Sequence, residues 1–110
     1  MGASKTHHFT AGQNELATLM KALGHPARIA IVDYLLTVSD CICGDIVAEL
    51  SLAQPTVSQH LKELKNAGLI KGTIEGTAIC YCLDESTFKK FDSYLSHIFK
   101  TLQQKKKSCC

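Results

Sequence analysis

The spacing of apolar residues changes once along the chain, at Gly68, and this change divides the expected fold into a helical part and a β part. Before Gly68, apolar residues recur at the three- to four-residue spacing of amphipathic helices. After it, residues 69–74 and 78–83 form two short β-prone runs joined by Glu75–Gly76–Thr77, a pattern that predicts a hairpin. The expected fold class is mostly α with a small β-hairpin.

Four helices are expected before the hairpin, and Pro and Gly residues mark several of their ends. The first is Gln13–Leu23, the second runs from Pro26 to a break at 39–44, the third is Asp45–Leu50, and the fourth opens at Pro55 and stops at Gly68. The apolar residues expected to face the core are Leu16, Met20 and Leu23; Ile29, Val32 and Leu36; Ile46, Val47 and Leu50; and Val57, Leu61 and Leu64.

A fifth helix is expected after the hairpin, capped by Asp84 or Ser86. Its apolar residues recur at alternating steps of three and four, which is the spacing of a coiled-coil seam. These residues are Phe88, Phe91, Leu95, Ile98 and Leu102. The seam suits either a pairing surface or the core of one chain, and the element order becomes ααααββα.

Composition places this chain of 110 residues among ordinary globular domains, with 45% apolar and 20% charged residues and a net charge of +2. We expect one domain at residues 13–102, a flexible N-terminal segment at 1–12 and a flexible basic, Cys-ending tail at 103–110. No apolar run is long enough to span a membrane, and no secretory signal is seen at the N-terminus, so we expect a cytoplasmic protein.

The segment 54–61 predicts the second helix of a helix-turn-helix, the element that lies in the DNA major groove. Short polar side chains on its outer side suit contacts with base edges and phosphates. An ordinary amphipathic helix is the alternative, and the hairpin that follows favours DNA binding because a β-wing can reach the flanking backbone. The expected DNA-binding residues are Gln54, Thr56, Ser58, Gln59, His60, Lys62 and Lys65 in the helix, with Lys71 and Thr77 in the wing.

Six cysteines fall in three close pairs, and Cys41–Ile42–Cys43 is the most informative of them. Residues two apart point in different directions on a helix but to the same side of an extended segment. A site built on Cys41 and Cys43 therefore needs non-helical backbone. Thiolates favour soft metal ions and metalloids over Mg²⁺ or Ca²⁺. The alternative for this pair is two small buried apolar residues.

Four segments, in order and at compatible spacing, resemble the ArsR/SmtB family of winged-helix, metal-responsive transcriptional repressors. They are 23–29 (Leu-Gly-His-Pro-Ala-Arg-Ile), 41–46 (Cys-Ile-Cys-Gly-Asp-Ile), 53–64 (Ala-Gln-Pro-Thr-Val-Ser-Gln-His-Leu-Lys-Glu-Leu) and 67–70 (Ala-Gly-Leu-Ile). The resemblance covers residues 13–102. It implies a homodimer built through its first and last helices, which binds operator DNA and releases it when a metal or metalloid binds.

Cys41 and Cys43 look like the arsenic- and antimony-sensing site that members of this family carry. The family's best-known pattern has a third cysteine where this chain has Ile46. We expect As(III) or Sb(III) as the inducer. The source of a third ligand stays open between Cys109 or Cys110 of the tail, the partner subunit and a small cellular thiol, with Cys80 and Cys82 as weaker candidates; a site of two thiolates is the remaining alternative.

Two other inputs to the same DNA-binding fold stay open: a thiol-based redox or sulfide signal, and Cd(II) or Pb(II). An enzyme is not expected, because the cysteines lack a Cys-x-x-Cys spacing, a surrounding βαβ unit and an evident base.

Overall fold

The computed structural model describes residues 8–38, 42–43, 50, 52–75 and 78–105. Within them lie four helices and three strands, in the order α1 (Ala11–Leu23), α2 (Pro26–Thr37), β1 (Ile42–Cys43), α4 (Gln54–Asn66), β2 (Ile70–Glu75), β3 (Ala78–Leu83) and α5 (Glu85–Lys105). Of the helix predicted at 45–50, only Leu50 belongs to the described residues. The other predicted helices and the hairpin are confirmed, and β1 is an addition to them.

Side-chain caps fix where three of the helices begin. The hydroxyl of Thr10 accepts a hydrogen bond from the Gln13 backbone N–H, and the Gln13 side chain accepts one from the Thr10 N–H, so α1 begins two residues earlier than predicted. His25 caps α2 by accepting from the Ala27 N–H. Asp84 caps α5 by accepting from the backbone N–H and the hydroxyl of Ser86.

The end of α4 is set by Gly68, which has a φ of +84°. The N–H of Leu69 donates to the Leu64 carbonyl, and the N–H of Gly68 donates to the Lys65 carbonyl. This pair of bonds is a Schellman motif, which requires a left-handed residue that glycine adopts without steric cost. The predicted stop at Gly68 is therefore confirmed, and the chain turns there into β2.

The sheet has three antiparallel strands in the order β1-β3-β2. The predicted hairpin is β2 and β3, with Ile70 paired to Leu83 and Glu75 paired to Ala78. The strand β1 lies on the other edge of β3 and comes from the segment that was predicted only to be non-helical. A strand of only two residues is too short to show an alternation of apolar and polar side chains, so the pairing of β1 could not be predicted from its local sequence.

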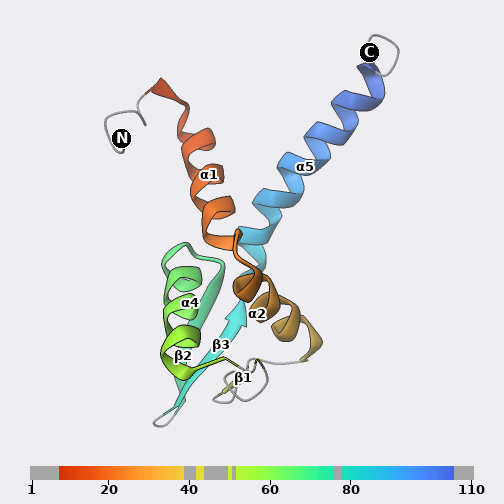
Figure 1. Ribbon diagram of the computed structural model, residues 1–110. Helices are drawn as coiled ribbons and strands as arrows, with labels where there is room; N and C mark the ends of the chain where they lie inside the picture. The colour runs from red at the N-terminus through yellow and green to blue at the C-terminus, as the bar shows by residue number, and fades with distance from the viewer. Residues whose placement is uncertain (1–7, 39–41, 44–49, 51, 76–77, 106–110) are drawn as a thin grey trace.

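One hydrophobic core joins the helices to the sheet. Figure 1 shows α2, α4 and the sheet grouped at one end of the molecule, while α1 and α5 extend from it at the other end. The fully buried centre lies where α2 and α4 meet β2. Its buried members are Leu19, Ile31, Leu35, Val57, Leu61, Leu64, Leu69 and Ile70.

The core face of α4 is as predicted, whereas the faces predicted for α1 and α2 are right only in part: Leu23 of α1 packs against the core and Val32 of α2 is buried, as expected. Leu19 is the buried residue of α1, whereas Met20 is 40% exposed. In α2, Ile31 and Leu35 are buried beside the correctly predicted Val32, whereas Ile29 and Leu36 are exposed. The physical reason is that α2 is apolar almost all round, so its sequence offers two overlapping stripes of similar spacing.

The seam predicted on α5 divides into two parts. Phe88 and Phe91 pack against the core of the same chain. Farther along, Leu95 and Leu102 are exposed. The helix continues to Lys105, beyond the expected domain end at 102, and residues 106–110 lie outside the described part. None of the described helices combines the length and apolarity that crossing a membrane requires.

Candidate functional site

The helix α4 presents a mixed surface, apolar toward the core and polar toward solvent. Val57, Leu61 and Leu64 are buried, and they fix the rotation of the helix against α2 and β2. Pro55 lies in its first turn, where its missing N–H costs no helical hydrogen bond. The rotation leaves the opposite face free over the whole length of the helix.

That free face carries most of the predicted DNA-binding residues of α4. All are exposed, namely Gln54, Thr56, Ser58, Gln59, Lys62 and Lys65. The Gln59 amide donates to the Glu63 carboxylate at 3.0 Å, so a base contact from Gln59 would have to replace this bond. The lysines add positive charge suited to phosphates, and the hydroxyls and amides suit base edges. A surface of this composition suits contacts with the DNA major groove.

His60 differs from these residues, and its predicted place on the DNA-binding face is corrected. Its side chain is only 8% exposed, and its Nδ1 accepts a hydrogen bond from Arg28 Nε at 3.1 Å. Burial, helped by the charges of His25 and Arg28 and opposed by that of Glu63, lowers the pKa of His60. His60 is therefore buried and hydrogen-bonded to Arg28, and it does not lie on the exposed face of α4.

Arg28 makes the hydrogen bonds that hold His60 and the neighbouring helices together. Its Nη1 donates to the Ala22 carbonyl at 2.9 Å, while its Nε holds His60. The ring of His25 lies 4.4 Å from that of His60, between ring centroids. Arg28 thus ties the end of α1, the start of α2 and the middle of α4 together. Sequence reasoning missed this role, although the only arginine of the chain lies two residues after the helix-opening pair His25–Pro26, which is a signal that could have prompted it.

The wing formed by β2 and β3 follows α4 directly. Lys71 on β2 is exposed, as its predicted contact with DNA requires. Thr77, the other predicted wing contact, lies outside the described residues. The strand β2 packs against α4. A displacement of the sheet would therefore also displace α4, the helix predicted to lie in the DNA major groove.

The structure describes only some of the cysteines that were predicted to form the thiol site. Cys43 lies in β1, in extended backbone as the Cys-x-Cys hypothesis required, and Cys41 lies outside the described residues. The β1–β3 register places Cys43 directly opposite Cys80. Cys80 is 1% exposed, and both Cys80 and Cys82 are disulfide-bonded. Cys109 and Cys110 lie outside the described residues.

Among the side chains that the structure describes, no group of three or more His, Cys, Asp or Glu residues is arranged to hold a metal ion. The cysteines within the described residues are Cys43 of β1 and the disulfide-bonded Cys80 and Cys82 of β3. Sulfur donors of this kind fit a soft ion or metalloid better than they fit Mg²⁺ or Ca²⁺.

Comparison with known sequences identifies relatives of this chain. Residues 25–71 match the family described as "Bacterial regulatory protein, arsR family". An uncharacterized HTH-type transcriptional regulator from Methanocaldococcus jannaschii is 40% identical over 75 residues, which cover 67% of this chain and 83% of that protein. The HTH-type transcriptional repressor SmtB from Mycobacterium tuberculosis is 41% identical over 80 residues, covering 73% of this chain and 53% of the repressor, so the chain spans about half of its length.

Solved structures agree with these relatives in fold. An ArsR-like transcriptional regulator from Rhodococcus sp. RHA1 superposes with a TM-score of 0.76 at 20% identity, covering 90% of this chain and 92% of that one. A homodimeric winged helix-turn-helix DNA-binding domain from Mycobacterium bovis gives 0.66 at 22% identity, covering 96% and 94%. The cadmium metal-sensor CMTR from Mycobacterium tuberculosis gives 0.52 at 38% identity, covering 66% and 74%.

The winged helix-turn-helix prediction is confirmed by these structures. The relatives are transcriptional regulators and not enzymes, which agrees with the expectation from the cysteine spacing. A relative that is 40% identical over most of its own length adds to the family match at residues 25–71, and the chain therefore belongs to the arsR family of bacterial regulatory proteins.

Proposed function

We propose that this protein is a cytoplasmic, homodimeric repressor that binds operator DNA through α4 and the wing and releases it when As(III) or Sb(III) binds Cys41 and Cys43. The observation that carries the proposal is the extended backbone of β1 at Ile42–Cys43, shortly before the reading helix. Extended backbone lets residues two apart point to one side, which two thiolates need in order to hold one ion.

The exposed polar face of α4 supports the DNA-binding part of the proposal. Gln54, Thr56, Ser58 and Gln59 would meet base edges, and Lys62, Lys65 and Lys71 would meet phosphates. Thr77, which lies between the two wing strands in the sequence, is a further proposed contact. Replacing Lys62 by Ala should weaken binding about equally for all DNA sequences and make the salt dependence of binding shallower, by about 1 in slope for each lysine–phosphate pair removed. Lys100→Ala is the matched control, because it removes the same charge from an exposed position on α5.

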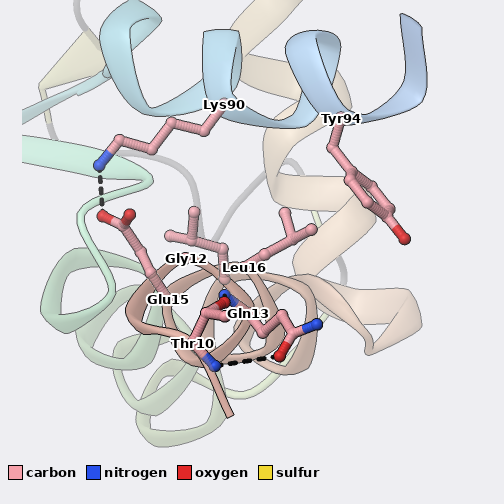
Figure 2. Close-up of a pocket in the computed structure, with 8 residues that line it drawn as sticks. Thr10, Gly12, Gln13, Glu15, Leu16, Lys90 and Tyr94 are labelled. Atoms are coloured by element: carbon pink, nitrogen blue, oxygen red, sulfur yellow. Dashed lines mark hydrogen bonds and ion pairs between the residues drawn. The ribbon is translucent and has the colours of Figure 1, made fainter. Parts of the chain in front are cut away.

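A second copy of the chain is proposed to cover the apolar surfaces of α1 and α5. A groove of about 350 Å³ lies between them, lined by Glu15 and Leu16 of α1 and by Lys90 and Tyr94 of α5. Figure 2 shows Lys90 reaching across it to Glu15. Both side chains of the Glu15–Lys90 ion pair across the groove are about half exposed to solvent, so this pair adds little stability. Large exposed apolar side chains extend this surface: Met20 on α1, and Tyr94, Leu95, Phe99 and Leu102 on α5. A patch of this kind is typical of a protein–protein interface, and the similar Mycobacterium bovis domain is homodimeric.

Release of DNA is proposed to follow from movement of the chain beneath the reading helix. Two thiolates drawn onto one atom restrain the segment that leads from β1 toward α4. The helix α4 packs against both α2 and β2. A shift of either element would therefore change the tilt of α4. A ligand shifts this equilibrium only by its differential affinity for the two arrangements.

The test is a titration of As(III) into a fluorescent complex of the protein with a DNA site selected from a random library. The wild type should release DNA, and Cys43→Ser should bind DNA with unchanged affinity but resist release. The matched control is Lys21→Ser, which introduces serine at an exposed position of α1 and leaves all six cysteines unchanged. Normal release from the Cys41→Ser/Cys43→Ser double variant would refute the proposed sensing site.

A redox or sulfide signal is the second candidate, and the disulfide-bonded state of Cys80 and Cys82 favours it. An oxidant such as diamide, or polysulfide, would then release DNA in the absence of metal. Cd(II) is a further candidate inducer because a relative 38% identical over part of the chain is a cadmium sensor. Competing titrations of As(III), Sb(III), Cd(II) and Pb(II) against the same complex separate these inputs.

A further inference from the structure

The hydrogen bond between Arg28 and His60 joins α4 to the two helices that precede it. Arg28 Nε donates to His60 Nδ1 at 3.1 Å, and Arg28 Nη1 donates to the Ala22 carbonyl at 2.9 Å. The second bond fixes the guanidinium against the end of α1, so the first bond sets where His60 lies relative to α1 and α2. His60 directly follows Gln59, a residue of the exposed face of α4, so its position is coupled to the position of that face.

This bond adds direction to the contacts that hold α4. The buried residues Val57, Leu61 and Leu64 hold the helix by apolar packing, which is not directional. A hydrogen bond weakens steeply once its donor and acceptor are more than about 3.5 Å apart. A shift of His60 by less than about 1 Å away from Arg28 would therefore end the bond. We call this pair the Arg28–His60 clamp.

The clamp can form only while Nδ1 of His60 carries no proton. An arginine guanidinium stays protonated in proteins and can only donate hydrogen bonds, so Nδ1 of His60 must be the acceptor. A proton on Nδ1 turns this acceptor into a donor and places a positive imidazolium beside the positive guanidinium of Arg28. Protonation of His60 therefore replaces an attractive contact by a repulsive one at the same place.

Burial and nearby positive charge favour the unprotonated form of His60. Burial is the largest cause that lowers its pKa, the charges of His25 and Arg28 lower the pKa further, and the charge of Glu63 raises it. The ring of His25 is fixed at the start of α2 because its Nδ1 accepts from the Ala27 N–H, and it lies 4.4 Å from the His60 ring between centroids. His60 is therefore unprotonated near neutral pH and gains a proton as the pH falls below 6.5.

Charged residues of the other elements packed against α4 do not reverse this balance. From α1, Lys21 lines a groove together with Arg28 and Glu63, so another positive charge lies beside Arg28. From β2, Lys71 acts on the capping residue of α5 instead. Apart from Glu63, no described neighbour therefore offsets the cost of a positive charge on His60.

We propose that the Arg28–His60 clamp holds α4 in its DNA-binding orientation, and that a proton on His60 opens the clamp and weakens DNA binding. This inference rests on the DNA-binding part of the proposed function and adds the proton as an input that needs no cysteine. Arg28 and His60 are positioning residues in this scheme, because both act on DNA through the exposed face of α4.

The size of the expected effect follows from the fraction of chains in which the clamp is closed. The apparent affinity of a protein falls in proportion to the fraction of its molecules in the binding-competent state. One pH unit below the pKa of His60, about ten of eleven chains carry the extra proton, so DNA affinity should be about tenfold lower. Near neutral pH the clamp is closed and this loss is absent.

The test measures DNA affinity of the full chain by fluorescence anisotropy from about pH 7.5 to about pH 5, with no metal or metalloid added. The wild type should lose at least about tenfold in affinity while its circular dichroism stays that of folded protein. His60→Gln should keep the affinity at about pH 7.5 within about twofold, because the Gln oxygen can accept from Arg28, and should lose most of the pH dependence. His97→Gln is the matched control, since it removes a histidine from an exposed position of α5, and it should keep the wild-type profile.

Arg28→Met tests the clamp from its other side, at about pH 7.5, where acid does not affect folding. This variant should bind DNA at least about threefold more weakly than the wild type, because the bond to His60 is gone. The slope of its affinity against salt concentration should equal that of the wild type. A residue that contacts phosphate behaves differently, since its loss makes this slope shallower by about 1.

Three results would overturn the inference while DNA binding and its release by As(III) stand. They are a wild-type affinity that changes by less than about twofold over the pH range, a His60→Gln profile equal to that of the wild type, and a salt slope of Arg28→Met shallower by about 1. If the protein selects no DNA sequence from a random library at about pH 7.5, the proposed function itself is wrong, and this inference fails with it.

Discussion

Replacing Arg28 by Met should destabilise the protein because it removes the side chain that ties three helices together. Arg28 donates to His60 Nδ1 at 3.1 Å and to the Ala22 carbonyl at 2.9 Å. Hydrogen bonds from charged donors contribute about 1.5–3 kcal/mol each. Because Arg28 is only half-buried, water weakens both of its bonds, and we expect the free energy of unfolding to fall by about 2–3 kcal/mol in total. Met keeps most of the apolar stem, so the loss reports the polar contacts and not the packing.

The assay is urea unfolding of wild type and variant, followed by circular dichroism at one fixed protein concentration, since dimerisation couples stability to concentration. Lys62→Met is the matched control, because it makes the same kind of change at an exposed position of α4, where substitutions usually stay within about 0.5 kcal/mol. A loss at Arg28 no larger than the control loss would refute the view that this cluster holds α4 in place.

Three further outcomes are expected. The pKa of His60 in the folded protein lies below 6.5, so the unfolded chain binds more protons near that pH. The free energy of unfolding should therefore fall as the pH drops through 6.5 and level off below the folded pKa. His60→Gln should flatten this slope in urea melts at several pH values. Gly68→Ala should cost more than about 1 kcal/mol in the same melts, since φ is +84° there, and Gly68→Asn should cost less. Phe99→Asp should convert dimers to monomers in sedimentation analysis, whereas Gln104→Asp should not; dimers of Phe99→Asp at micromolar concentration would contradict the proposed interface.

The sequence predicted best what depends on neighbouring residues. The inward residues of α4 recur at helical spacing between a proline start and a glycine stop, and no second stripe on that helix competes with them. Gly68 was predictable because few residues adopt a positive φ, and the hairpin was predictable because its turn lies between two β-prone runs.

The predictions failed where distant contacts decide the outcome. The core face of α2 depends on which of two apolar stripes meets α4. The position of His60 depends on Arg28, a residue far away in sequence and adjacent in space. The strand β1 exists only because β3 pairs with it. For the same reason, the closeness of Cys43 to Cys80 could not be inferred from cysteine spacing, although both residues were named as candidate ligands.

The central claim is that occupancy of the thiol site and loss of DNA binding are one event. The most direct measurement follows both quantities on a single reduced sample, with native mass spectrometry counting bound As(III) per dimer and fluorescence anisotropy reporting bound DNA. DNA should be released in proportion to occupancy, and completely at one ion per chain. DNA that stays bound at full occupancy, or DNA that leaves before any ion is bound, would contradict it.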